Sequence, residues 1–141
     1  MPNYDASLTN NSNRITRQYI DLDLDFGRNV VTNDINKLTD VEAVKRSVRN
    51  LINTSHLDRP FHPEIGSDVR LLLFENITPL TALNLQRKVQ EVLVNFEPRI
   101  KLVQILANPD IDNNSYNLTT TFYIIGSSEP VVVETFLERL R

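Results

Sequence analysis

Hydrophobic and polar residues follow two different periodicities along this chain. Residues 40–53 and 79–95 place apolar side chains three and four positions apart, which is typical of helices with one buried face. Residues 19–26 and 116–125 alternate every second position, and residues 100–106 are rich in aliphatic side chains, both typical of strands. Helices therefore come first and an antiparallel sheet last, which predicts an α+β fold with helices packed on a small antiparallel sheet.

Local signals mark where the helices begin. Thr39 and Glu42 match a capping box, and Thr78-Pro79 places proline at a first helical position, where its missing N–H costs nothing. Ser67 or Asp68 can cap a short helix that runs through Phe74. The predicted buried residues are Val41, Val44, Val48, Leu51 and Ile52 in the first helix, and Ala82, Leu85, Val89, Val92, Leu93 and Phe96 in the long one.

Three connections and the carboxyl end complete the predicted order of elements. Residues 27–37 read as an irregular connection, residues 58–66 as a loop stiffened by two prolines, and residues 108–115 as a turn. Residues 128–130 can open a terminal helix with Val133, Phe136, Leu137 and Leu140 on one face. The valines at 131–133 also suit a third strand, but we predict the helix.

The joint between the long helix and the first sheet strand is the most informative segment. Pro98 must end the helix at or before Glu97, and it pushes Glu97 toward an extended conformation. Glu97 and Arg99 should then project from the same side of the chain, as a charged pair suited to docking on a polar surface. A mutual surface pair, worth under about 1 kcal/mol, is the alternative, and the sequence leaves open whether Arg99 faces a partner or its own domain.

The amino-terminal segment has two parts. Residues 1–14 are polar and rich in Asn and Ser, so we predict a mobile arm there and a single domain over residues 15–141. Within residues 19–26, Ile20, Leu22, Leu24 and Phe26 share one face, and Asp21, Asp23 and Asp25 share the other. This pattern predicts a half-buried strand with the aspartates on its wet face, or an extended arm laid on the domain.

Composition limits the classes of partner and chemistry. Apolar residues make up 40% and charged residues 23%, as in ordinary globular proteins, and the net charge of −3 disfavours nucleic acid as a partner. Cysteine is absent, which excludes disulfides and thiolate sites. With no signal peptide and no stretch that spans a bilayer, we expect assembly in a cytoplasm without membrane contact.

Neither metal binding nor a cofactor is predicted. Residues 21–25 resemble the start of a calcium loop, but Phe26 stands at the glycine position and Thr32 at the bidentate glutamate position. His56 and His62 do not have the spacing of a ligand pair on one helix.

Catalysis by paired carboxylates is the main enzymatic alternative. A glycosidase needs two carboxylates about 5–9.5 Å apart across a cleft, and Glu64, Glu75 and Glu97 are available. The aromatic candidates for stacking on a sugar, Phe61 and Phe74, are expected in the core instead. We therefore predict a protein without catalytic residues.

Three ordered motifs resemble a known family. They are residues 59–67 (RPFHPEIGS), 73–82 (LFENITPLTA) and 95–100 (NFEPRI). Together they look like the small baseplate wedge proteins of contractile-tailed phages, closest to those of T4-like phages, with the type VI secretion subunit TssE as a more distant relative. The resemblance extends over roughly residues 39–102.

The resemblance implies a structural virion component present in several copies in a symmetric baseplate. Glu97, Pro98 and Arg99 would dock on the helical core bundle of the wedge, with Arg59 and Pro60 also contacting partners. The fold would resemble the handshake domain of sheath subunits, so that its sheet accepts strands from the first sheath ring and initiates sheath assembly. The alternative is a peptidoglycan hydrolase, since some family members are labelled lysozyme-like.

Overall fold

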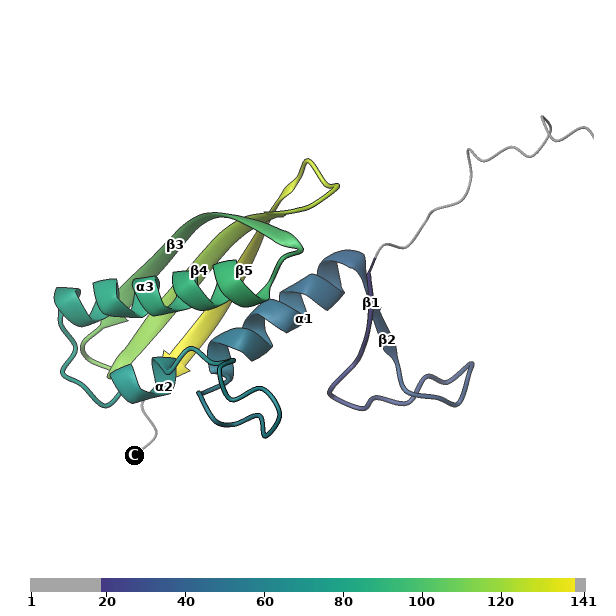
Figure 1. Cartoon of the computed structure of the whole chain (residues 1–141), viewed down its shortest axis with the longest axis horizontal. Helices are drawn as coiled ribbons and strands as arrows, with labels where there is room; N and C mark the ends of the chain where they lie inside the picture. The colour runs from purple at the N-terminus through teal and green to yellow at the C-terminus, as the bar shows by residue number, and fades with distance from the viewer. Residues whose placement is uncertain (1–18, 139–141) are drawn as a thin grey trace, which may run out of the picture. The chain divides into compact units, whose positions relative to one another are not determined.

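A computed structural model describes residues 19–138 of the chain, which forms two compact units, Met1–Asp40 and Val41–Arg141 (Figure 1). The arm predicted for residues 1–14 lies outside the described residues. No helix within residues 19–138 has both the length and the apolar character required to cross a membrane.

The first unit contains a short antiparallel hairpin. Strand β1 (Ile20–Leu22) pairs with β2 (Lys37–Thr39), so that Ile20 lies opposite Thr39. The predicted strand over residues 19–26 is therefore shorter than expected, and the supposedly irregular residues 27–37 end in a strand. The amino end of the hairpin is held because Asp40 N–H donates to the Tyr19 carbonyl at 2.8 Å.

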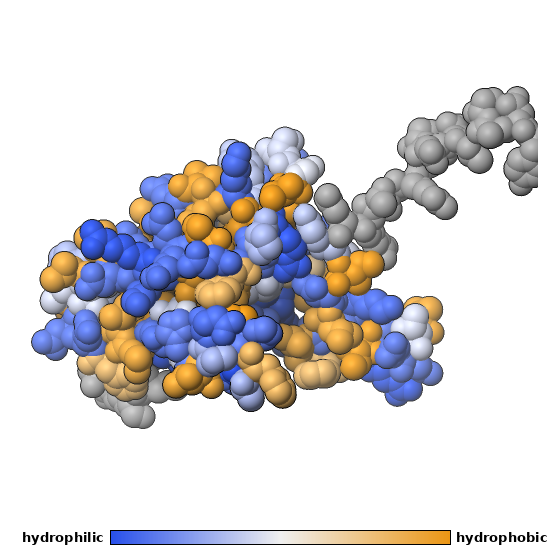
Figure 2. Space-filling view, viewed as in Figure 1, coloured by the Kyte–Doolittle hydropathy of each residue, from blue (hydrophilic) through white to orange (hydrophobic). Residues whose placement is uncertain are grey.

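The two faces of this hairpin are the reverse of the expected ones. Leu22 and Phe26 are 55% and 66% exposed, whereas Asp21 and Asp23 are half-buried. Local hydrogen bonds hold the Asp23 turn, because its Oδ1 accepts the N–H of Asp25 at 3.1 Å and its own N–H donates to the Asn36 carbonyl at 2.9 Å. Figure 2 shows hydrophobic surface over the part of the view that the hairpin occupies.

Three helices belong to the rest of the chain. Helix α1 spans Asp40–Asn53, α2 spans Val69–Leu72 and α3 spans Pro79–Phe96. The α3 start is as predicted, since the Thr78 side chain accepts the Thr81 N–H at 3.1 Å. Helix α1 also begins where predicted, at Asp40, but the Glu42 carboxylate of the predicted capping box pairs with Lys45 at 2.9 Å. The buried residues are Ala43, Val44, Val48, Leu51 and Ile52 in α1, and Thr81, Ala82, Leu85, Val89, Val92 and Leu93 in α3.

Two positions differ from the predicted helix faces, and α2 is shorter than expected. Val41 is 38% exposed, so the buried face of α1 begins at Ala43. Phe96 is half-buried, so the fully buried face of α3 ends at Leu93. Helix α2 ends at Leu72, before the predicted Phe74, and its Asp68 side chain makes no capping bond.

A three-stranded antiparallel sheet supplies the other layer. Strands β3 (Ile100–Asp110), β4 (Ser115–Ile124) and β5 (Pro130–Glu138) lie in the order β3-β4-β5. Figure 1 shows the long helices on one face of this sheet. Alternate side chains of the central strand β4 fill the core on that face: Tyr116, Leu118, Thr120, Phe122 and Ile124.

The predicted terminal helix is wrong, because residues 130–138 form β5. Its side chains alternate with a period of two, so that Val131, Val133 and Leu137 are buried while Val132 and Phe136 are 51% and 58% exposed. β-Branched residues fit a pleated strand, and every residue of β5 from 130 to 138 has a partner on β4. Pairing between strands thus decides a segment that local sequence leaves ambiguous.

The loop between α1 and α2 is anchored at its carboxyl end. Ser67 N–H donates to the Thr54 carbonyl at 2.9 Å, and its hydroxyl donates to the Ile52 carbonyl. Gly66 is buried against the same turn, where an added Cβ would lie 2.4 Å from the backbone nitrogen of His56. Only glycine fits this close approach of two backbone segments.

We predict that Gly66→Ala lowers the free energy of unfolding by roughly 1–3 kcal/mol, because the backbone of residues 55–56 must move. Urea unfolding measures this change. Gly27→Ala is the matched control, since its nearest contact is the flexible Asn36 side chain. Equal unfolding midpoints for both variants would contradict the account of Gly66.

Candidate docking site

The joint after α3 is a rigid turn. Helix α3 ends at Phe96, as Pro98 requires, and the Glu97 N–H still donates to the Leu93 carbonyl at 3.1 Å. On the other side of Pro98, the Ile125 N–H donates to the Arg99 carbonyl at 2.9 Å. The joint is therefore tied both to the end of α3 and to the chain that leaves β4.

Glu97 and Arg99 form a bidentate ion pair across Pro98. Arg99 Nε donates to Glu97 Oε1 at 2.7 Å, and Arg99 Nη2 donates to Oε2 at 2.8 Å. The two side chains lie on the same side of the chain, as predicted. The Glu97 side chain is only 2% exposed and that of Arg99 is 23% exposed, so the interpretation as a surface pair is wrong. Arg99 is directed toward its own domain.

Electrostatics keeps the Glu97 carboxylate ionised despite its burial. Burial by itself raises the pKa of Glu97, but the hydrogen bonds and charge of Arg99 and a hydrogen bond from Ser47 lower it by more. The net pKa lies below its ordinary value of 4.5. A buried carboxylate of this kind depends on its partners, because it remains charged where water cannot solvate it.

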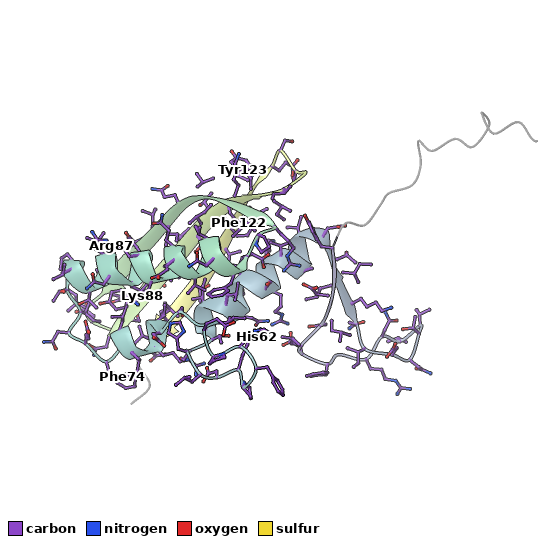
Figure 3. All side chains as sticks on the ribbon, viewed as in Figure 1. His62, Phe74, Arg87, Lys88, Phe122 and Tyr123 are labelled. Carbon is purple, nitrogen blue, oxygen red and sulfur yellow. The ribbon has the colours of Figure 1, made fainter. Side chains whose placement is uncertain are left out.

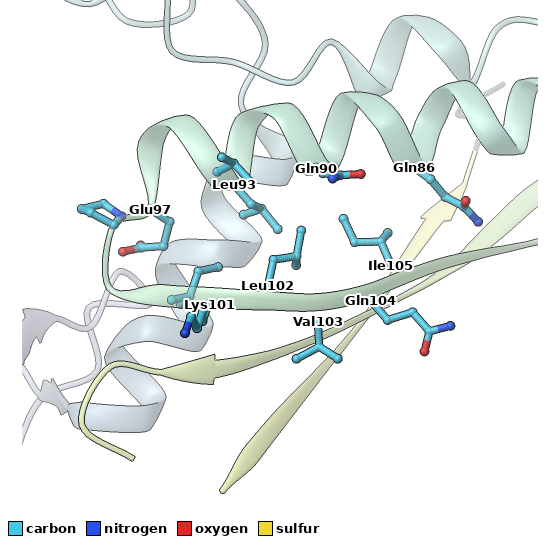
Figure 4. Close-up of a pocket in the computed structure, with 12 residues that line it drawn as sticks. Gln86, Gln90, Leu93, Glu97, Lys101, Leu102, Val103, Gln104 and Ile105 are labelled. Carbon is cyan, nitrogen blue, oxygen red and sulfur yellow. The ribbon is translucent and has the colours of Figure 1, made fainter. Parts of the chain in front are cut away.

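A groove of about 520 Å³ lies beside the joint, between α3 and β3 (Figure 4). Its walls combine amides and aliphatic groups: Gln86, Gln90, Leu93 and Val94 from α3, Glu97 and Pro98 from the joint, and residues 100–105 from β3. Val94 and Val103 are 64% and 56% exposed, and Pro98 is exposed as well. The groove thus offers apolar contacts and amide hydrogen-bonding groups together.

Arg59 and Pro60, the other predicted contact residues, lie elsewhere in the fold. Both are exposed on the turn of the loop between α1 and α2, where the Arg59 carbonyl accepts the His62 N–H at 3.2 Å. His62 is on this loop and Phe74 follows α2 (Figure 3). The structure does not bring Arg59 and Pro60 into the groove beside the joint.

The aromatic side chains expected in the core are at the surface. Phe61 is 92% exposed and Phe74 is 60% exposed, because Phe61 sits on the loop turn and Phe74 lies beyond the end of α2. Within residues 19–138 no three His, Asp or Glu side chains gather as metal ligands would.

Glu64, a candidate catalytic carboxylate, is exposed and pairs with His62 at 3.1 Å. Backbone hydrogen bonding, followed by the His62 hydrogen bond, lowers the pKa of Glu64. A general acid of a glycosidase needs the opposite shift.

Sequence reasoning missed several residues around the joint. Ser47 lies on α1, fifty positions before Glu97, and no periodicity connects the two. Gln86, Gln90 and Val94 are not among the residues singled out from the sequence, although their positions beside the buried stripe could have suggested the wall of a groove.

Comparison with known proteins identifies the family. The family model named baseplate wedge protein gp25 matches residues 39–128, more than half of the chain. The chain belongs to the baseplate wedge protein gp25 family. Baseplate wedge protein gp25 of Enterobacteria phage T4 is 30% identical over 121 residues, which cover 83% of this chain and 88% of the T4 protein.

Solved structures with the same fold come from related assemblies. A Geobacter sulfurreducens protein provisionally assigned as a tail lysozyme has a TM-score of 0.63 at 19% identity, covering 70% of this chain and 89% of its own. A chain of the anti-feeding prophage baseplate has a TM-score of 0.61 at 21% identity and covers 87% of both chains. A chain of the postcontracted pyocin R2 baseplate has a TM-score of 0.53 at 20% identity, covering 84% of this chain and 98% of its own.

These similarities confirm the predicted family, the α+β fold and the virion location. This gp25 family member is a baseplate wedge protein of a contractile tail and hence a component of the virion. Its relative in T4 is likewise named as a baseplate wedge protein.

We predict that Arg99→Ala lowers the free energy of unfolding at pH 7 by on the order of 3 kcal/mol, because the buried Glu97 carboxylate loses its partner. The pKa of Glu97 is lowered in the folded state, so the pair contributes stability above about pH 4.5 and loses it as pH falls through the folded pKa. The deficit of the variant should therefore shrink between pH 7 and pH 3.5.

Urea unfolding across this pH range measures the effect. Arg87→Ala, on the exposed side of α3 (Figure 3), is the control and should change stability little at any pH. A deficit for Arg99→Ala that did not depend on pH would contradict the role given to the Glu97 charge.

Proposed function

We propose that this wedge protein docks on the helical core bundle of the baseplate wedge through the Glu97-Pro98-Arg99 joint and the groove beside it. The observation that carries the proposal is the bidentate Glu97–Arg99 pair, which fixes exposed Pro98 at the mouth of a groove that is open to solvent. The role of Arg99 changes accordingly. It holds the docking surface in shape and does not reach out as a free charge.

A preformed joint favours docking because little has to be ordered when the partner arrives. Ordering a rotamer-rich side chain at an interface costs about 0.5–1.5 kcal/mol, and Arg99 meets that cost within the folded domain. A helix with an apolar stripe flanked by polar residues fits this groove. Its apolar stripe would contact the exposed Val94 and Val103, and its polar residues would hydrogen-bond to Gln86 and Gln90. A helical partner therefore matches the chemistry of this groove.

The same domain would serve as the platform on which the tail sheath starts. Its three-stranded sheet has two outer strands, each with one side that no strand covers among the described residues. Such edges accept extended segments of other proteins through main-chain hydrogen bonds. This property supports the proposal that subunits of the first sheath ring each add a strand to the sheet. A similar fold occurs in the six-fold symmetrised anti-feeding prophage baseplate, so we infer several equivalent copies per baseplate.

A structural role rather than hydrolysis fits the carboxylates. The pKa of both Glu64 and Glu97 lies below its ordinary value, and Glu97 has both oxygens bound by Arg99. Neither group is suited to donate a proton to a glycosidic oxygen near neutral pH. We infer that the protein works by binding alone.

For the docking role, we predict that Val94→Lys weakens binding to the wedge core proteins of the same phage by about tenfold or more, or about 1.4 kcal/mol. The lysine places a charge in the groove, yet it lies near the carboxyl end of α3, where the helix dipole favours a cation. Lost binding would thus not reflect a weakened helix. Co-purification of wedge complexes and titration measure the effect.

Leu80→Lys is the matched control, because Leu80 is 67% exposed at the other end of α3 and is not part of the groove. It should bind like the unmodified protein. If Val94→Lys assembled as well as the control did, the groove would not be the docking surface.

Hydrolysis is tested directly with purified protein and isolated cell walls at several pH values between 4 and 8. We expect no release of soluble sugar fragments above that of a buffer control, with hen egg-white lysozyme as the positive control. If the protein did release sugar fragments and the Glu64→Gln variant did not, the enzymatic alternative would be established instead.

A further inference from the structure

The loop between α1 and α2 forms a surface of its own. It carries residues 59–67, one of the three segments that resemble the family, but none of its residues lines the groove beside the joint. Residues 56–64 are all exposed. Figure 1 shows this loop standing clear of the helices and the sheet, and Figure 3 labels His62 on it. The exposed part of this motif is therefore explained neither by the core nor by the groove.

Hydrogen bonds and prolines hold this exposed loop in one shape. The Leu57 N–H donates to the Pro63 carbonyl at 3.1 Å, which closes the loop, and the His62 N–H donates to the Arg59 carbonyl at 3.2 Å, which forms a turn at its tip. Pro60 fixes a further φ angle within that turn. The closure holds Leu57 at φ 71°, a left-handed conformation that leucine rarely adopts. The loop therefore has its shape before any partner arrives.

The tip of the loop presents an aromatic ring and a cation. Phe61 is 92% exposed. Arg59 is exposed as well, and its guanidinium has no carboxylate partner within residues 19–138. The neighbouring carboxylates are already engaged, since Asp58 accepts a backbone N–H at 2.8 Å and Glu64 pairs with His62 at 3.1 Å. Aromatic side chains and arginine are the residues enriched at protein interfaces.

We propose that the tip of this loop is a second contact site, at which Phe61 enters an apolar pocket on another protein of the same wedge. Arg59 would pair with a carboxylate at the rim of that pocket. The partner surface is thus a hollow lined by aliphatic or aromatic groups, with an Asp or Glu at its edge. This site is additional to the groove, and it rests on membership of the wedge family rather than on docking at the joint.

Rigid presentation explains how so small a surface contributes to binding. An aromatic side chain removes about 150–250 Å² from water when it is buried, and a ring on an exposed turn can enter a pocket without any change in its own domain. Because the turn is already ordered, little conformational entropy is lost when the partner arrives. The surrounding contacts then have only to exclude water from the ring and from the ion pair.

A second copy of this chain is a less suitable partner. Its apolar hollow of about 230 Å³ at the carboxyl end of β5 is lined by Arg70 as well as Glu138. An incoming Arg59 would therefore meet a like charge beside the opposite one. A pocket whose rim carries a carboxylate alone matches the charge of the loop tip better.

Phe61→Gln tests the knob. It should weaken binding to the wedge complex formed by the other wedge proteins of the same phage by about tenfold or more, as measured by titration. Ile111→Gln is the matched control, because Ile111 is 71% exposed on the turn between β3 and β4. Both variants should unfold at the urea midpoint of the unmodified protein, since both side chains are exposed. Equal affinities of the two variants would overturn the proposal.

Arg59→Gln tests the carboxylate at the rim. It should weaken binding several-fold at low salt, and the difference from the unmodified protein should shrink as salt is added, because ions screen a charge pair at the rim. Lys88→Gln removes the same charge from the exposed side of α3 and should bind normally (Figure 3). A loss of affinity of the same size in both variants would rule out a specific partner for Arg59.

The loop and the groove can fail separately. If Val94→Lys bound normally while Phe61→Gln did not, the groove would not be the docking surface and the loop contact would stand. Loss of binding in Val94→Lys alone would mean the reverse.

Photo-cross-linking from a Phe61→p-benzoylphenylalanine variant in assembled wedges identifies the occupant directly. We expect an adduct with an apolar segment of another wedge protein that carries an Asp or Glu nearby. An adduct between two copies of this chain, or no adduct in wedges that contain the variant, would overturn the proposal.

Discussion

The carboxylate of Glu97, held out of water at the end of α3, is the constraint on which the arrangement of this domain depends. It stays charged only because Arg99, two residues further on, donates to both of its oxygens. Arg99 in turn is tied through its carbonyl to Ile125 after β4, and Ser47 brings in α1. One ion pair thus connects two helices with two strands, at the point where the chain passes from the helical layer to the sheet.

The placement of α3 also determines where the groove lies. Because the joint sends β3 back along α3, the two elements run side by side and the groove opens between them (Figure 4). One wall of the groove is therefore a helix, and the other is an outer strand of the sheet. In the proposed docking role, a partner in the groove would contact both layers of the domain at once.

Features fixed by local chemistry were predictable from sequence, and those fixed by distant contacts were not. The Thr78 cap, the end of α3 before Pro98 and the shared side of Glu97 and Arg99 follow from neighbouring residues. The burial of Glu97 does not, because Ser47 is fifty residues away. Similarly, β5 is a strand because β4 pairs with it, whereas its own spacing also fits a helix. The hairpin also departs from the alternation rule, since Leu22 and Phe26 are exposed where the pattern predicts a buried face.

Stability alone does not account for an ion pair at this joint. An apolar pair of similar volume is often as stable or more stable than a buried salt bridge, since both charges must be taken out of water. An apolar pair, however, would leave the turn around Pro98 without the directional bonds that fix its angle. The bidentate geometry of a guanidinium and a carboxylate allows little rotation, so it sets the orientation of Pro98 and of the groove walls. For a subunit that docks through this joint as proposed, the fixed orientation of Pro98 is a physical reason for an ion pair at a position where an apolar pair would also be stable.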